Sequence, residues 1–223
     1  MGSKNKLKRF RENDTFPNVI QPERKEVLDG FSLKGNWHTH FNNNNPIVLE
    51  LGCGKGEYTI ALARKNPTIN YIGIDLKGAR FWRGAKTALE ENLTNVAFIR
   101  TQIELIDLLF TENEVDEIWI TFPDPQIKYT RTKHRLTNAE FLKKYDTVLK
   151  PNGIVNLKTD SEFMHGYTLG LLHGAGHEVL YAHHDIYKNT HSPEEVTSTQ
   201  TFYESQYLET GKPITYIKFK LRY

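Results

Sequence analysis

Carboxylate side chains stand at the ends of four expected strands, where they could bind or orient a ligand. Glu50 lies at the end of a first apolar run, just before a glycine-rich turn, and Asp75, Asp124 and Asp160 each follow a later run. In a parallel α/β sheet the carboxyl ends of the strands meet at one edge, and ligands bind along that edge. These four acids are therefore the first candidates for chemistry.

The glycine-rich turn reads ELGCGKG over residues 50–56. Gly52, Gly54 and Gly56 would let the backbone pass close to a ligand that lies over the strand ends. A phosphate-binding P-loop ends in Gly-Lys-Ser/Thr, and a dinucleotide fingerprint has the spacing GxGxxG. This turn has the spacing GxGxG with Glu50 two residues before it, which argues against both common nucleotide sites.

A second acid fits the same ligand. Asp75 follows the second expected strand, where a carboxylate can accept hydrogen bonds from the hydroxyls of a ribose. Glu50 would repel a diphosphate beneath the loop but could bind a cation or an ammonium group. S-adenosylmethionine has an adenosine, a sulfonium and an α-amino group, and no phosphate. The two acids and the turn therefore favour this cofactor; a glycine turn with incidental acids is the alternative.

Asp124 stands between two prolines, in the run FPDP at residues 122–125. Prolines fix their own φ and restrict the residue before them, so Asp124 would be held stiffly at the sheet edge. Methyltransferases that act on adenine amino groups place Asn/Asp-Pro-Pro-aromatic at a similar point, but here Gln126 occupies the aromatic position. Asp124 is thus a candidate acceptor for the edge of a base; a plain loop aspartate is the alternative.

Two short segments concentrate positive charge, although the formal net charge of the 223 residues is only +2. Residues 1–11 contain five basic side chains and no acidic one, and residues 126–135 contain Lys128, Arg131, Lys133 and Arg135 without Asp or Glu. A positive strip beside an acid suits a phosphate backbone whose base enters a pocket. Solvated surface is the alternative for each segment.

Composition excludes several classes of protein. Hydrophobic residues make up 38% of the chain and aromatic residues 12%, which is enough to build a core, so we expect the chain to fold. No uncharged apolar run is long enough to span a membrane, and no apolar segment follows the N-terminus as in a signal peptide. The single cysteine, Cys53, suits a reducing compartment, so we expect a cytoplasmic protein. The histidine pairs have no cysteine partner and no HExxH spacing, so we expect no metal site.

Strand and helix patterns alternate from residue 47 onward. We expect strands at 47–51, 70–74, 96–100, 117–122, 154–158, 179–183 and 214–221, and helices at 58–65, 78–91, 104–110, 138–149 and 162–174. This order predicts a doubly wound, Rossmann-like α/β sheet with helices on both faces. No clear helix is expected between the last two strands, which favours an antiparallel strand near one edge. The asparagine-rich loop at 42–45 separates a basic N-terminal extension, residues 1–45, from the main domain, residues 46–223.

Together these motifs resemble the bacterial tRNA (guanine-N7)-methyltransferase family, a class I S-adenosylmethionine-dependent group. The resemblance covers roughly residues 47–221. It rests on the glycine-rich turn, on Gly73-Ile74-Asp75, on Phe122-Pro123-Asp124-Pro125, on Arg135-Leu136-Thr137, on Thr159-Asp160 and on Thr201-Phe202-Tyr203-Glu204. The proline-flanked aspartate, the basic stretch after it and the late threonine-x-tyrosine-glutamate are its most specific parts.

The resemblance implies methyl transfer from S-adenosylmethionine to N7 of the guanine at position 46, in the variable loop of tRNA. It implies cofactor binding by Glu50, Gly52, Gly54, Gly56, Asp75, Gln102 and Asp124, with Asp124 also the catalytic residue. It implies substrate binding by Lys128, Asp160, Thr201, Tyr203 and Glu204. Many members have an acid where Gln102 stands, and an amide oxygen can accept the same hydrogen bond. Gln126 replaces the usual tryptophan, and Phe202 a frequently polar residue.

Two other functions remain open from the residues themselves. A small-molecule methyltransferase of the same fold would explain the cofactor motifs but not the basic segments. A non-catalytic RNA-binding relative would explain the basic segments but not the retained acids. The oligomeric state is open between a monomer and a homodimer.

Overall fold

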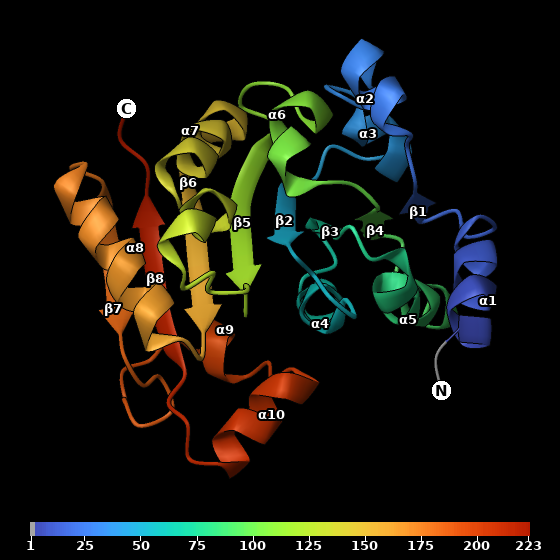
Figure 1. The fold of residues 1–223 in the computed structure, drawn as a ribbon. Coiled ribbons are helices and arrows are strands. Elements are labelled where there is room, and N and C mark those ends of the chain that lie inside the picture. The colour runs from blue at the N-terminus through green and yellow to red at the C-terminus, as the bar shows by residue number, and fades with distance from the viewer. Residues whose placement is uncertain (1–2) are drawn as a thin grey trace.

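A mostly parallel sheet runs through the centre of the computed structural model, which describes residues 3–223 (Figure 1). The strands are β1 (Val19–Ile20), β2 (Ile47–Leu51), β3 (Asn70–Ile74), β4 (Val96–Ile99), β5 (Val115–Thr121), β6 (Leu149–Thr159), β7 (Glu178–His183) and β8 (Thr215–Lys220). The α-helices are α1 (Ser3–Asn13), α2 (Arg24–Gly30), α3 (Trp37–Phe41), α4 (Glu57–Lys65), α5 (Gly78–Glu90), α6 (Ile106–Leu109), α7 (Ala139–Val148), α8 (Glu162–Gly174), α9 (Glu194–Thr197) and α10 (Phe202–Glu209). Two short 3₁₀ helices are η1 (Ile103–Leu105) and η2 (Tyr129–His134).

The strand order is β1-β4-β3-β2-β5-β6-β8-β7. Strands β1 to β6 are parallel, whereas β8 is antiparallel to both of its neighbours, β6 and β7. The predicted doubly wound α/β sheet with an antiparallel strand near one edge is therefore confirmed. The chain reverses direction across the sheet at β2, and the carboxyl ends of β2 and β5 lie side by side there. Ligands bind at such a switch point in open α/β sheets.

Each face of the sheet carries its own hydrophobic core, because successive strand residues point to opposite faces. Leu49 and Leu51 of β2 belong to the core that α6, α7 and α8 cover, whereas Val48 belongs to the core that α4 and α5 cover. Both faces of β2 are buried, which explains its uninterrupted apolar sequence before Glu50.

The start of α4 is fixed by close backbone packing. A β-carbon at Gly56 would lie 2.6 Å from the ring of Phe98, and one at Gly84 would lie 2.8 Å from the carbonyl oxygen of Lys55. These two glycines let α4 and α5 approach β4 closely. The turn that precedes α4 is thereby held over the ends of the central strands.

The N-terminal segment, predicted as a basic extension, packs on the sheet over the residues that the structure describes. Helix α1 lies along α5, where the Asn13 side chain donates to the carbonyl of Gly78 at 3.0 Å, and β1 pairs with β4. Residues 1 and 2 of the extension lie outside the described residues. With only two residues, β1 is too short to show the alternation by which strands are predicted.

The expectation that no helix separates the last two strands is wrong, because α9 and α10 stand between β7 and β8. Helix α10 begins with a capping box: the hydroxyl of Thr201 accepts from the N–H of Glu204 at 3.3 Å, and the Glu204 carboxylate accepts from the N–H of Thr201 at 3.2 Å. Both helices are short and show no strong apolar periodicity. The capping box is the one sequence signal for α10. Helix α10 lies beyond the carboxyl ends of β5 and β6 (Figure 1).

Candidate active site

Glu50 has both carboxylate oxygens hydrogen bonded inside the protein. One oxygen accepts from the backbone N–H of Thr59 at 2.8 Å and from the Thr59 hydroxyl, and the other accepts from the hydroxyl of Thr121 at 2.6 Å. Burial raises the pKa of Glu50 to about 7, although these hydrogen bonds oppose the shift. A cation bound beside this carboxyl group would favour its ionised form.

Asp75 ties the tip of the glycine-rich turn to the end of β3. One carboxylate oxygen accepts from the N–H of Gly54 at 3.0 Å, and the other accepts from the N–H of Lys77 at 2.7 Å. Each oxygen retains a lone pair, because a carboxylate oxygen can accept two hydrogen bonds. Asp75 is half-buried, so these lone pairs are available to the hydroxyls of a ligand.

A cavity of about 130 Å³ lies over the glycine-rich turn. Five predicted site residues line it together: Glu50, Gly52, Gly54, Thr201 and Tyr203. The other lining residues are Cys53, Lys55, Glu57, Tyr58, Arg80, Thr121 and Phe122. The wall opposite the turn therefore comes from the start of α10, far along the chain.

Gly54 and Gly56 have different roles in the turn. Both have a positive φ, 56° and 74°, which side chains rarely adopt. A β-carbon at Gly54 would meet nothing closer than 4.0 Å, so the backbone there is open to the cavity, whereas Gly56 faces the ring of Phe98. Gly54 thus leaves room for a ligand, and Gly56 leaves room for the core.

Gln102 lines a second cavity, of about 250 Å³, beyond Asp75. Leu76 and Leu105 provide apolar surface there, and the oxygen of the Gln102 side chain accepts from Arg24. A third cavity, of about 540 Å³, shares Arg80 with the first and Leu76 with the second. Asp75 bonds to Gly54 of the first cavity and directly precedes Leu76 of the second, so it stands between the residues that line these two cavities.

This succession of groups fits S-adenosylmethionine. In the first cavity the Glu50 carboxyl group and the open backbone of the turn suit a cationic amino-acid end, Asp75 suits the ribose hydroxyls, and the second cavity suits a planar base. Gly54 leaves the space that a ligand lying across the turn would need.

The loop that carries Asp124 is held in an unusual shape by a buried arginine. Phe122 and Gln126 have φ values of 48° and 46°, which bulky residues adopt only when their surroundings impose them. Arg135 donates to the carbonyl of Gln126 at 3.1 Å and to that of Ile127 at 3.2 Å. Its guanidinium also lies against the rings of Phe163 and Tyr167 on α8, 4.8 and 4.4 Å from their centres. Arg135, which the sequence places in a basic strip, thus supports the loop from below.

Asp124 itself is exposed. Its carboxylate accepts only from the N–H of Gln126, at 3.1 Å, among the described residues. It lines an open hollow of about 440 Å³ together with Lys128 and Arg131. Asp124 and Lys128 are therefore neighbours, and Phe122 joins their loop to the cavity over the glycine-rich turn.

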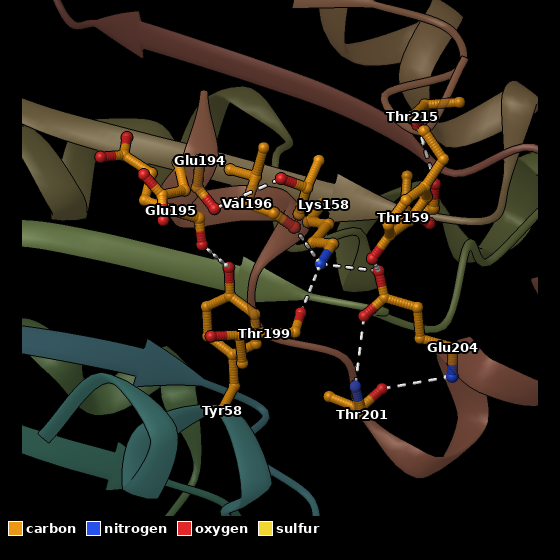
Figure 2. Close-up of polar contacts among 12 residues, drawn as sticks. Tyr58, Lys158, Thr159, Glu194, Glu195, Val196, Thr199, Thr201, Glu204 and Thr215 are labelled. Carbon is orange, nitrogen blue, oxygen red and sulfur yellow. Dashed lines mark hydrogen bonds and ion pairs between the residues drawn. The ribbon is translucent and has the colours of Figure 1, made fainter. Parts of the chain in front are cut away.

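Asp160 and Glu204 are both paired with lysines. Asp160 forms an ion pair with Lys212, and Glu204 is fully buried, 2.6 Å from the ammonium of Lys158 (Figure 2). Glu204 therefore lies behind the wall that Thr201 and Tyr203 present to the cavity. Substrate binding by Asp160, Thr201, Tyr203 and Glu204 stays a prediction.

Sequence reasoning missed three groups that shape the site: Thr59 and Thr121, which hold Glu50, and Lys158. No signal in the sequence indicates the burial of Lys158, because β6 also contains Lys150, Asn152 and Asn156. In residues 3–223, no three His, Cys, Asp or Glu side chains gather as metal ligands would. Among the helices that the structure describes, none is long and apolar enough to cross a membrane.

Comparison with known proteins identifies the family. Residues 44–217 match the profile of a family described as "Putative methyltransferase". The chain is 75% identical over 224 aligned residues, covering all of both chains, to the tRNA (guanine-N(7)-)-methyltransferase of Christiangramia forsetii. It is 50% identical to the protein of that name from Porphyromonas gingivalis, over 93% of this chain and 86% of that one.

Solved structures agree on the fold. The crystal structure of the 16S rRNA methyltransferase KamB superimposes with a TM-score of 0.64 at 15% identity, covering 85% of this chain and 94% of that one. At this identity the likeness concerns the class I methyltransferase fold alone. The family resemblance predicted from the motifs is confirmed by the full-length relatives: the chain belongs to the tRNA (guanine-N(7)-)-methyltransferase family.

Proposed function

We propose that this protein transfers a methyl group from S-adenosylmethionine to N7 of a guanine in tRNA, at position 46 of the variable loop by family resemblance. The observation that carries the proposal is the 75% identity, over the whole chain, to a relative of that activity. The carboxylates, the glycine-rich turn and the basic loop at one sheet edge support it independently.

The cofactor would lie in the first and second cavities, which flank Asp75. Glu50 would face its cationic amino-acid end, Asp75 would accept from its ribose, and Gln102 would accept from the amino group of its adenine. The open backbone at Gly52 and Gly54 would let it pass over the turn. When bound, S-adenosylmethionine supplies a methyl group on a positively charged sulfur.

Guanine N7 already has a free lone pair, so no residue must remove a proton before it can react. The protein's work is then to hold the base in line and to stabilise charge. The N1–H and amino group on the edge of guanine are donors, and Asp124 offers an exposed carboxylate to accept them. Methylation at N7 leaves a positive charge on the base, which the same carboxylate would offset. Asp160 and Tyr203 would bound the base from the other side.

The RNA backbone would be held by cations on both sides of the cavity. Lys128 and Arg131 line the hollow beside Asp124, and the third cavity is lined by Lys6, Arg9, Lys77, Arg80 and Arg100. Asp124 is the one carboxylate among the described residues that line these two cavities, so both cavities present positive potential to a phosphate chain. We propose tRNA in the cytoplasm as the partner.

The test is transfer of a labelled methyl group from S-adenosylmethionine to unmodified tRNA, followed by digestion and nucleoside analysis. Labelled 7-methylguanosine is expected, and tRNA with guanine 46 changed to adenine serves as the control. A protein that binds the cofactor but labels neither tRNA would act on a small molecule or lack catalysis. Label in another nucleoside would contradict the proposed acceptor.

A further inference from the structure

Lys158 is a fully buried lysine that the proposed reaction does not use. It stands on β6, two residues before Asp160, with its side chain entirely inaccessible to solvent. Its ammonium donates to the carbonyl of Val196 at 2.6 Å and to that of Thr199 at 3.0 Å, and it pairs with the Glu204 carboxylate at 2.6 Å (Figure 2). Each of its three hydrogens therefore has an acceptor.

A buried lysine is costly, so its presence calls for a physical reason. Burial lowers the pKa of Lys158, and the neighbouring Glu204 carboxylate opposes that effect. A buried ion pair is often no more stable than an apolar pair of the same volume, whereas it fixes geometry because each partner needs the other. The reason is therefore to be sought in what Lys158 positions.

The three acceptors belong to one segment. The carbonyl of Val196 is in α9, that of Thr199 follows α9, and Glu204 is in the first turn of α10. Glu204 also accepts from the hydroxyl of Tyr187 at 2.7 Å and from the N–H of Thr201, so its position determines the start of α10. One ammonium group thus fixes both ends of residues 196–204.

The same segment carries two residues into the wall of the cavity. Thr201 and Tyr203 line it, and the N–H of Phe202 between them donates to the carboxylate of Glu57 at 2.9 Å. Lys65 makes a weaker attachment, from the surface, to the side-chain hydroxyls of Ser198 and Thr199. Lys158 is the attachment that acts from within the core.

We infer that Lys158 is a positioning residue that holds α9 and α10 against β6, so that Thr201 and Tyr203 close the wall of the cavity over the glycine-rich turn. The inference rests on the proposed function in that this cavity takes S-adenosylmethionine. Lys158 itself touches no reacting atom; it acts through the segment that it binds.

The first test is Lys158→Met, which keeps most of the length of the unbranched side chain and removes its charge and donors. Amide hydrogen exchange in residues 196–209 is expected to become at least tenfold faster, while the amides of β2 and β5 keep their protection. The Kd for S-adenosylmethionine, measured by calorimetry without tRNA, is expected to rise about tenfold. Both readouts are independent of methyl transfer, so a failure of the proposed reaction would be seen separately.

Two further variants separate positioning from simple stability. Lys65→Met removes a neighbouring lysine that contacts the same segment from outside, and it is expected to change cofactor affinity less than twofold. Lys158→Met combined with Glu204→Gln removes both buried charges together. The double variant is expected to regain much of the Tm that Lys158→Met alone loses, but not the slow exchange or the cofactor affinity, because Val196 and Thr199 still lack their donor.

Unchanged exchange of residues 196–209 in Lys158→Met would overturn the inference. So would recovery of cofactor affinity in the double variant, since that result would assign Lys158 to charge compensation alone. If Lys158→Met does not fold, the double variant decides by itself: fast exchange confined to residues 196–209 supports the inference, and exchange like that of the unaltered protein contradicts it.

Discussion

Glu50 makes the stability of the folded protein depend on pH, and in the proposed function the same group binds the ligand. Its pKa is raised from its ordinary value near 4.5 to about 7, chiefly by burial. Between these values the unfolded chain releases the proton that the folded protein keeps, so stability falls as the pH rises from 4.5 to 7. A cationic ligand reverses this cost by pairing with the ionised carboxylate.

Glu50→Gln is therefore expected to stabilise the ligand-free protein at pH 8 while weakening cofactor binding. An amide has nearly the same shape and can bond to Thr59 and Thr121, but it does not ionise. The gain in unfolding free energy at pH 8 is about 3 kcal/mol at most and shrinks toward pH 4.5. Thermal unfolding at several pH values and calorimetry with S-adenosylmethionine measure the two effects.

The matched control is Glu117→Gln. Glu117 is on β5, burial also raises its pKa, and its carboxylate accepts from Asn156 at 2.6 Å. It does not line the cavity over the turn. This variant is expected to keep cofactor affinity within about twofold. Equal losses of affinity in both variants would show that Glu50 acts on the fold and not on the ligand.

Asp124→Asn tests the residue assigned to the base. An asparagine oxygen can still accept from the N–H of Gln126, so the loop should keep its shape, while the charge is lost. We expect kcat for tRNA methylation to fall by about 100-fold or more, as when a preorganised electrostatic group is removed. The Kd for S-adenosylmethionine should change less than threefold. A parallel loss of cofactor affinity would place Asp124 in the cofactor site.

At the scale of elements, the turn before α4 separates packing from binding. Gly56→Ala would drive a β-carbon into the ring of Phe98 at 2.6 Å and is expected to cost more than about 2 kcal/mol of unfolding free energy. Gly54→Ala meets only open space and should cost about 1 kcal/mol, for its positive φ. Urea unfolding gives both values.

The variant that costs less stability, Gly54→Ala, is expected to lose more affinity for the cofactor. Gly54→Ala fills space in the cavity and is expected to raise the Kd for S-adenosylmethionine at least tenfold in a protein that remains folded. If Gly54→Ala binds normally, the ligand does not lie across the turn at that residue.

Periodic elements could be predicted from the sequence, and short or capped ones could not. The helix expected at 78–91 is observed as α5 (Gly78–Glu90), because its apolar residues recur at helical spacing over more than three turns. Strand β1 has two residues and α9 has four, too few for any period to emerge. Strand β1 is positioned by its pairing with β4, and α9 is held by the hydrogen bond from Lys158 to the carbonyl of Val196. Both are tertiary contacts.

The site divides in the same way. The glycine-rich turn is local in sequence, so its backbone, open to a cavity at Gly54, could be anticipated. The burial of Arg135 against Phe163 and Tyr167 depends on α8, and the pairing of Lys158 with Glu204 joins residues on different elements. A charged residue is predicted to be exposed unless its buried partner is known, and the sequence alone does not identify that partner.

For the whole molecule, the question is how far tRNA extends over its surface. Basic residues line the hollow beside Asp124, and a second group lines the cavity between α1 and α5. Each phosphate that a cation neutralises releases counterions, so the slope of log Kd against log salt counts such contacts, at roughly 0.7 to 0.9 per phosphate. The slope can therefore be divided between the two basic regions.

Lys128→Ala with Arg131→Ala is expected to lower the slope for tRNA binding by about 1.5, because both exposed side chains flank Asp124. Lys6→Ala with Lys77→Ala tests the region between α1 and α5 in the same way, with a similar expected loss. Lys143→Ala, at an exposed ion pair with Glu140 on α7, is the control and should leave the slope unchanged. A slope altered only by the first pair would confine tRNA to the side of Asp124, and the cations beside α1 would then lie outside the path of the RNA.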